Sequence, residues 1–267
     1  MANHGVFPFG RKVKVLRQKD RSHKDAFVLG VYASAVHARW IGRDGKQKVA
    51  ALAVASEPRM FWRGDDADRI VSRINLPAGV GRLLPADRRF NGPSGRSLDD
   101  RFLTPLGLNR EGVWLCDIYP YAMVNPNQLK AIGEKYRRLA SKHNLPQPQL
   151  EVAPTRSPGK VRVCEIMAEL RESGSKTLVL LGDRPIQWFL SAFQDEYKRL
   201  SDFGTDPSDY GLLHTFELEG YELRVLPLVH PRQASRLGRS SGSWGRVHDE
   251  WIQQRAPTLL RSGDRYD

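Results

Sequence analysis

Residues 177–182 read Thr-Leu-Val-Leu-Leu-Gly, a short apolar run that stops at a glycine. Its length and its Val and Leu content are typical of a strand buried on both faces of a sheet. Three further runs have the same character and stop near Gly, Asp or Pro: 26–32, 113–118 and 223–229. We therefore expect these runs to form the interior of one sheet.

Helical patterns lie between the apolar runs, at 65–74, 161–170, 185–193 and 244–254. The clearest begins at Asn125-Pro126 and carries a stripe of Leu129, Ile132, Tyr136, Leu139 and Ala140. Residues 36–43 and 47–55 flank a Gly-Arg-Asp-Gly turn and predict a hairpin. Strands that alternate with helices favour an α/β sandwich around a mainly parallel sheet, in which sites form at the carboxyl ends of the strands.

The charge balance points to a polyanionic partner. The 267 residues include 42 Lys and Arg against 30 Asp and Glu, a formal net charge of +12. No stretch approaches the roughly 20 apolar residues that span a bilayer, and the first residues do not resemble a secretory signal. The two cysteines, Cys116 and Cys164, are too few for a disulfide framework or a four-thiolate cluster, so we expect a cytoplasmic location and no metal or other cofactor.

Five segments place small, aromatic and polar residues close to the ends of the expected strands. In chain order they are 30–34 (Gly-Val-Tyr-Ala-Ser), 90–95 (Phe-Asn-Gly-Pro-Ser-Gly), 115–118 (Leu-Cys-Asp-Ile), 178–182 (Leu-Val-Leu-Leu-Gly) and His230-Pro231. The second segment continues with Leu98, Phe102, Gly107-Leu108 and Arg110. In order and spacing they resemble the motifs of the uracil-DNA glycosylase superfamily, especially its iron–sulfur branch, although the chain lacks the cysteines of that branch.

The resemblance implies a fold and an activity. The fold is a three-layer α/β/α sandwich with a central, mainly parallel four-stranded sheet in residues 25–256, between a basic N-terminal arm (1–24) and a C-terminal tail (257–267). The activity is base excision: the enzyme flips a nucleotide out of the stack and hydrolyses the bond between sugar and base. We expect Tyr32, Phe90, Asp117 and His230 to surround one pocket.

By resemblance, Phe90 binds the flipped base and His230 stabilises the departing base. Phe90 would stack on the flipped base, a contact worth roughly 1–3 kcal/mol. His230, directly after an apolar strand, would donate a hydrogen bond where negative charge develops on the departing base.

Asp117 departs from the superfamily, which usually has Asn at this position. Asn suits uracil, which presents O4 and N3–H, whereas cytosine presents an amine at C4 and a bare acceptor at N3. A carboxyl group accepts from the amine and, when protonated, also donates to N3. Asp117 therefore favours a cytosine-type base over uracil.

The first loop departs as well. Tyr32 stands where relatives carry a group that activates water, and a tyrosine with a pKa near 10 is a poor general base. The group that orients water stays open among Tyr32, Ser34, Asp183 and His37. Ala33 and Ser34 are small where the uracil enzymes carry a bulky wall, which leaves room for a substituent at C5 of the base.

Basic residues after His230 predict a DNA contact. By resemblance this segment enters the minor groove, with Arg236 and Leu237 as candidates for the wedge. Arg232, Arg239 and Arg246 would meet phosphates, and Ser94 and Gly95 are further DNA-binding candidates.

The function expected from the sequence is a monomeric DNA glycosylase that acts on double-stranded DNA and removes a 5-substituted cytosine. Hydroxymethylated or glucosylated cytosine of phage DNA is the model substrate, and antiviral defence the corresponding role. Two alternatives stay open: a repair enzyme for uracil or a deaminated base, and a nucleic-acid-binding homologue with weak catalysis.

Overall fold

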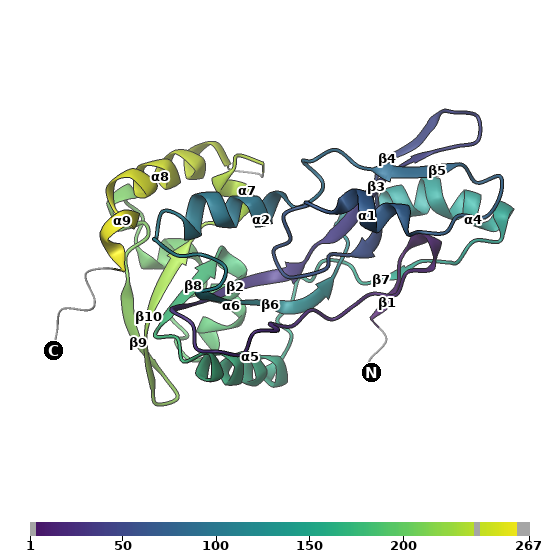
Figure 1. The fold of residues 1–267 in the computed structure, drawn as a ribbon. Helices are drawn as coiled ribbons and strands as arrows, with labels where there is room; N and C mark the ends of the chain where they lie inside the picture. Colours follow the sequence, from purple (N-terminus) through teal and green to yellow (C-terminus); the bar gives the residue numbers. More distant parts are fainter. Residues whose placement is uncertain (1–3, 238–240, 261–267) are drawn as a thin grey trace. The chain divides into compact units, whose positions relative to one another are not determined.

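The computed structural model describes residues 4–237 and 241–260 (Figure 1). Contacts between residues divide the chain into two compact units, each built from segments distant in the sequence. The first unit contains the chain up to Arg17, Tyr32–Pro93 and Tyr119–Thr155. The second contains Gln18–Val31, Ser94–Ile118 and the chain from Arg156 onward.

A mostly parallel sheet organises the second unit. Its strand order is β6-β2-β8-β10-β9, and both β2 and β6 continue into the first unit. The pairs β2–β8 and β8–β10 are parallel, whereas β9 pairs antiparallel with β10. The strands are β6 (Val113–Ala122), β2 (Ala26–Ala33), β8 (Thr177–Leu181), β10 (Tyr221–Leu228) and β9 (His214–Leu218). The mixed α/β class and the four apolar strands are thereby confirmed.

The expected number of four strands is wrong, because β9 adds a fifth strand at one edge. Its partner β10 follows after a two-residue turn in which Glu219 and Gly220 have φ values of 50° and 74°. Positive φ at both positions is the geometry of a tight hairpin turn. The sequence of β9 alternates polar and apolar residues, as an edge strand does, so it shows no continuous apolar run.

The second unit contains helices at the three predicted segments 161–170, 185–193 and 244–254, although their ends differ from the predicted ones. Helix α5 (Lys160–Ser173) buries Val163, Ile166, Met167 and Leu170 along one face. The other α-helices are α2 (Pro93–Leu98), α6 (Asp183–Trp188), α7 (Pro231–Ala234), α8 (Ser241–Gln254) and α9 (Ala256–Leu259). Shorter turns are η2 (Asp99–Leu103), η4 (Leu190–Ala192), η5 (Leu200–Phe203) and η6 (Pro207–Asp209).

The first unit contains the predicted hairpin. Strands β3 (Ala35–Ile41) and β4 (Gln47–Ser56) pair antiparallel, and β5 (Arg82–Pro85) joins the other edge of β3. The predicted helix that begins after Asn125 is also present, as three consecutive helical segments with Ile132, Tyr136 and Ala140 buried. The remaining elements are β1 (Gly5–Val6), η1 (Pro8–Gly10), α1 (Ala67–Ser72), α3 (Pro126–Ala131), η3 (Ile132–Tyr136), α4 (Arg137–His143) and β7 (Gln149–Leu150).

The N-terminal segment packs into the first unit. Strand β1 pairs with β7, and Phe7 and Phe9 lie in the apolar core. The backbone N–H of Phe9 donates to the Tyr136 hydroxyl, which in turn donates to the Pro146 carbonyl, each at 2.9 Å. The boundaries predicted for an arm, a central domain and a tail stay predictions, and residues 261–267 of that tail lie outside the described residues.

No helix in the described part of the chain is long and apolar enough to cross a membrane.

Tyr136→Phe should lower the free energy of unfolding by about 1–3 kcal/mol, because it leaves the buried N–H of Phe9 without its hydrogen-bond partner. Tyr121→Phe is the matched control, since its hydroxyl donates to Glu151 in an exposed position. Urea unfolding of both variants measures the difference. Equal stability of the two variants would contradict the anchoring of the N-terminal segment.

Candidate functional site

Asp117 is a buried carboxyl group in the second unit. Only 3% of the residue is exposed, and among the described residues its carboxylate has no hydrogen-bond or ion-pair partner. Burial raises the pKa of Asp117 to about 7, an effect that the positive charge of Arg162 partly opposes. The group therefore exchanges a proton close to neutral pH, which is unusual for a carboxyl and is typical of functional sites.

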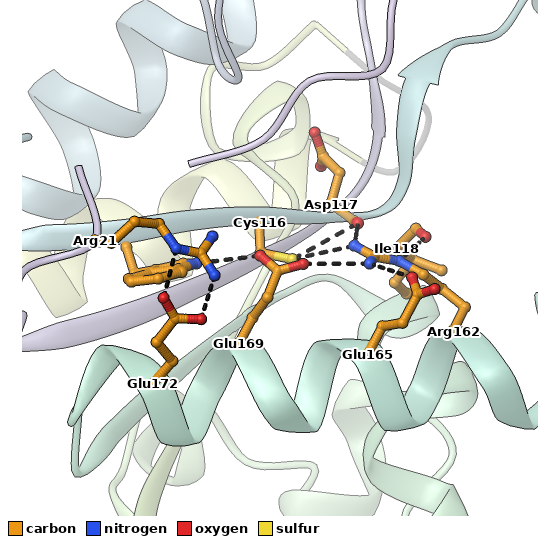
Figure 2. A network of polar contacts seen from close by, with 9 residues as sticks. Arg21, Cys116, Asp117, Ile118, Arg162, Glu165, Glu169 and Glu172 are labelled. Carbon is orange, nitrogen blue, oxygen red and sulfur yellow. Dashed lines mark hydrogen bonds and ion pairs between the residues drawn. The ribbon is translucent and has the colours of Figure 1, made fainter. Parts of the chain in front are cut away.

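Alternation along β6 explains why the Asp117 side chain is separated from Arg162. Successive side chains of a strand point to opposite faces. Cys116 faces helix α5, where its Sγ lies 3.4 Å from Nη2 of Arg162. Figure 2 shows the Asp117 carboxylate directed away from α5, on the other side of the strand.

Arg162 clamps the backbone of β6 at this point. Its Nη2 donates to the Asp117 carbonyl at 2.8 Å, and its Nε donates to the Ile118 carbonyl at 3.0 Å (Figure 2). The guanidinium group thus fixes two successive peptide groups while leaving the Asp117 side chain free of contact with it.

Two carboxylates on α5 balance the charge of Arg162. Its Nη1 lies 2.9 Å from Oε2 of Glu165 and 3.2 Å from Oε1 of Glu169. The side chains of Arg162 and Glu169 are each 12% exposed, and Nε1 of Trp114 donates to the second oxygen of Glu169. Because the guanidinium charge is neutralised locally, burial dominates the pKa of Asp117.

The Cys116 thiol takes no part in acid–base chemistry near neutral pH. Burial raises its pKa well above the ordinary value, and the nearby Glu169 raises it further. A thiol held in its neutral form is a poor nucleophile, so Cys116 contributes packing.

His230 lies two residues after the end of β10 and caps helix α7. Its Nδ1 accepts the backbone N–H of Arg232 at 3.2 Å, so the neutral ring carries its proton on Nε2. Burial, assisted by the charge of Arg232, lowers the pKa of His230 to about 4. At neutral pH the ring is uncharged and presents an N–H donor on its outer nitrogen, which suits the role predicted from the sequence.

Gly182 makes room for His230. Strands β8 and β10 end in register, Leu181 opposite Leu228, and the Gly182 N–H donates to the Leu228 carbonyl at 2.7 Å. Gly182 has a φ of 89°, and a Cβ atom there would lie 3.2 Å from Cβ of His230. The positive φ favours glycine here, and a Cβ atom would also crowd His230.

Helix α2 adjoins the same strand end. The buried Ser97 hydroxyl donates to the Pro231 carbonyl at 2.8 Å. The Gly95 carbonyl accepts from Arg110 at 3.2 Å, and Arg110 also donates to Asp99 at 2.7 Å. Three of the five sequence segments therefore meet within the second unit: the one that contains Ser94 and Gly95, the one that ends at Gly182, and His230-Pro231.

The segment after His230 is compact as far as the structure describes it. The Leu237 N–H donates to the Arg232 carbonyl at 2.7 Å, and the Leu237 side chain is 44% exposed. Arg236 is instead held by Asp249 at 2.9 Å, so of the two wedge candidates Leu237 is the exposed apolar one. Arg246 is exposed on α8, and Arg239 lies outside the described residues.

The first unit holds the remaining candidates. Tyr32 and the buried Ala33 end β2, and the next residue, Ser34, donates its N–H to Oε1 of Glu57 at 3.1 Å. Glu57 is 2% exposed and was not among the residues singled out from the sequence. An acidic residue two positions after the apolar run 47–55 was the available signal.

Phe90 is half-buried, and the loop around it is pinned to β3. The Asn91 side chain accepts the His37 N–H at 2.8 Å and donates to the His37 carbonyl at 3.0 Å. The Arg89 guanidinium lies 5.0 Å from the centroid of the Phe90 ring. Asp183, a candidate for orienting water, accepts the Leu200 N–H at 2.8 Å and so has a structural role within the second unit.

Asp117 and His230 belong to the second unit, whereas Tyr32, Ala33, Ser34 and Phe90 belong to the first. The expectation that they surround one pocket stays a prediction. In the described residues no three His, Cys, Asp or Glu side chains are grouped so as to hold a metal ion.

Comparison with known proteins finds no family model and no curated protein that matches the sequence.

The raised pKa of Asp117 predicts that this group stabilises the protein less as the pH rises, whereas an ordinary ion-paired carboxylate stabilises it more. The native state keeps this proton up to about pH 7, whereas the unfolded chain loses it near 3.8, so the group's contribution to stability falls as pH rises between these values. A shift of this size corresponds to on the order of 4 kcal/mol. The free energy of unfolding of Asp117→Asn, relative to that of the wild type, should therefore be higher at a pH of about 8 than at a pH of about 4. Urea unfolding at both pH values measures this difference, and the variant of the exposed Asp195, Asp195→Asn, is the control. If the stability of Asp117→Asn and of the wild type changes equally with pH, the raised pKa of Asp117 is contradicted.

Removing the clamp should raise the pKa of Asp117 further. Arg162→Gln deletes the positive charge that lowers this pKa, so the carboxyl should titrate above about 7. Carboxyl carbon shifts in an NMR titration report the value directly. Arg171→Gln, on the same helix but in an exposed pair with Glu219, should leave it unchanged. A pKa that falls or stays constant in Arg162→Gln would contradict the electrostatic role.

Proposed function

We propose that the chain is a DNA glycosylase that releases a 5-substituted cytosine from DNA and leaves an abasic site. The observation that carries the proposal is Asp117, a buried carboxyl with a pKa of about 7 and no partner among the described residues. Support comes also from the uncharged donor of His230 and from a sheet whose order accommodates the proposed three-layer sandwich.

The neutral form of Asp117 matches the edge of cytosine. Its carbonyl oxygen accepts a hydrogen bond from the C4 amine, and its O–H donates to N3. As the base departs, negative charge spreads onto N3 and O2, so a proton held at N3 stabilises the leaving group. A neutral carboxyl can also pair with N3–H and O4 of uracil, which makes uracil the comparison that decides the substrate.

The reaction is a hydrolysis. The bond between C1′ of the sugar and N1 of the base breaks, and the electron pair leaves with the base. The oxygen of a water molecule bonds to C1′, and the water loses a proton while the base gains one. In this proposal Asp117 supplies the proton at N3, and Nε2–H of His230 donates to O2.

The remaining roles follow from residue chemistry. Phe90 stacks on the base, and the small Ala33 and Ser34 leave space at C5. Glu57, which accepts the Ser34 N–H, joins Tyr32 and His37 as a candidate for orienting water, and it is the one carboxylate of the three. The +12 charge, with Arg232 and Arg246 exposed, supports DNA as the polyanionic partner.

Abasic-site formation on matched duplexes tests the proposal. The duplexes carry cytosine, 5-hydroxymethylcytosine, its glucosylated form or uracil. The wild type should act on a 5-substituted cytosine, and its rate should fall as pH rises above about 7, because Asp117 loses its proton.

Two variants assign the roles. Asp117→Asn should lose about two decades in rate on the cytosine substrate, because the amide keeps one acceptor and one donor but cannot transfer a proton to N3, whereas Asp195→Asn should leave the rate unchanged. His230→Ala should reduce single-turnover release by about 10²–10³ with DNA binding retained, and the exposed His23→Ala is its control. If the wild type prefers uracil and Asp117→Asn changes nothing, the cytosine proposal is wrong; DNA binding without any base release would favour the binding homologue.

A further inference from the structure

A cavity of about 250 Å³ opens in the second unit. The chain from η5 to Gly211, the end of β10 and the start of α8 form its walls. Phe203, Tyr210 and Trp244 supply aromatic surface, and Pro227 and Val247 add apolar surface. Neither Asp117 nor His230 lines this cavity.

The Tyr210 ring is a rigid wall. Its hydroxyl pairs with Nδ1 of His248 at 2.7 Å and accepts the Val229 N–H at 3.2 Å, so the polar end of the ring is turned into the protein. The Trp244 ring lies 6.0 Å from it between centroids, inclined by 46°. Aromatic walls that are held in place favour a flat, unsaturated ring as the occupant.

Two carboxylate residues are also among the walls of this cavity, and each of them accepts one backbone N–H of the other across η6. Asp206 and Asp209 belong to the loop that includes η6, and both are wall residues. Their oxygens accept hydrogen bonds and repel anions, which selects a ring with amino groups and excludes a phosphate at this side.

A second hollow of opposite charge adjoins the first. Arg236, Gly242, Ser243 and Arg246 line it, and Ser243 is a wall residue of both. Arg246 is exposed on α8, and Arg236 is held by Asp249 with its side chain 63% exposed. Two guanidinium groups beside an aromatic cavity are suited to a phosphate attached to a flat ring.

We propose that these two hollows form a nucleotide-binding site. A base that carries an exocyclic amine stacks in the aromatic cavity, with its amine donating to Asp206 or Asp209, and its phosphate lies against Arg246 and Arg236. The ligand is a free nucleotide or one nucleotide of a DNA strand, which share this chemistry. The site does not depend on the proposed base release, because none of its wall residues acts on the bond that breaks; Arg246 is shared with the proposed DNA contact.

Calorimetric titration of the full chain with deoxyadenosine monophosphate, thymidine monophosphate and a pentanucleotide of each base tests the site. Adenine has the exocyclic amine and thymine lacks it, so the adenine ligands should bind at least roughly tenfold more tightly. Comparable binding of the free nucleotide and the pentanucleotide identifies a free nucleotide as the source. Binding of the pentanucleotide alone identifies a DNA strand.

Variants separate this site from general attraction to DNA. Trp244→Leu should abolish the binding, and Arg246→Gln should weaken it roughly tenfold, whereas Arg171→Gln removes the same charge elsewhere in the unit and should have little effect. Asp209→Asn, an isosteric change, should reduce the ratio of the affinity for the adenine nucleotide to that for the thymine nucleotide. Equal affinity for the two bases, binding unchanged in Trp244→Leu, or no binding of either ligand would overturn the proposal. Base release is measured separately on modified duplexes, so either proposal can fail alone.

Discussion

One buried guanidinium group determines the arrangement around β6. Arg162 donates to two successive backbone carbonyls of the strand and is neutralised by two carboxylates of its own helix. Because a strand alternates its side chains, the residue between Cys116 and Ile118 must face the opposite side, away from this charge. The carboxyl group of Asp117 is therefore buried without the partner that would normally keep it ionised, and its pKa rises to about 7.

The polar groups at the end of β10 are also fixed by specific hydrogen bonds. His230 uses Nδ1 to cap α7, and this leaves Nε2–H as a donor. The preceding residue, Val229, gives its N–H to Tyr210, whose hydroxyl is also bonded to His248. A single strand end thus positions the proposed donor to the departing base and one wall of the proposed nucleotide site. The carboxyl ends of parallel strands serve this purpose because their backbone is rigid up to the last residue of the sheet.

Periodicity in the sequence was sufficient to predict the main elements. The apolar runs that became β2, β6, β8 and β10 are continuous because these strands are buried, and helix α5 follows from apolar residues at helical spacing. The turn at 42–45 predicted the pairing of β3 with β4. Strands β5 and β9 could not be predicted in this way, since both are short edge strands without a continuous buried run and depend on a neighbouring strand for hydrogen bonds.

For the candidate site, too, some properties followed from the sequence and others only from the tertiary structure. The sequence by itself determined which residues have suitable chemistry: a carboxyl at 117, an imidazole at 230, a glycine at 182 and a row of arginines beyond it. The tertiary structure decided what that chemistry becomes. The protonation of Asp117 depends on its burial and on Arg162, 45 residues away in the chain, and the tautomer of His230 depends on a backbone N–H that only the fold directs at it. The burial of Glu57 and the aromatic cavity were visible only in three dimensions, because a pKa, a tautomer and a cavity are properties of neighbours in space, and sequence order does not specify those neighbours.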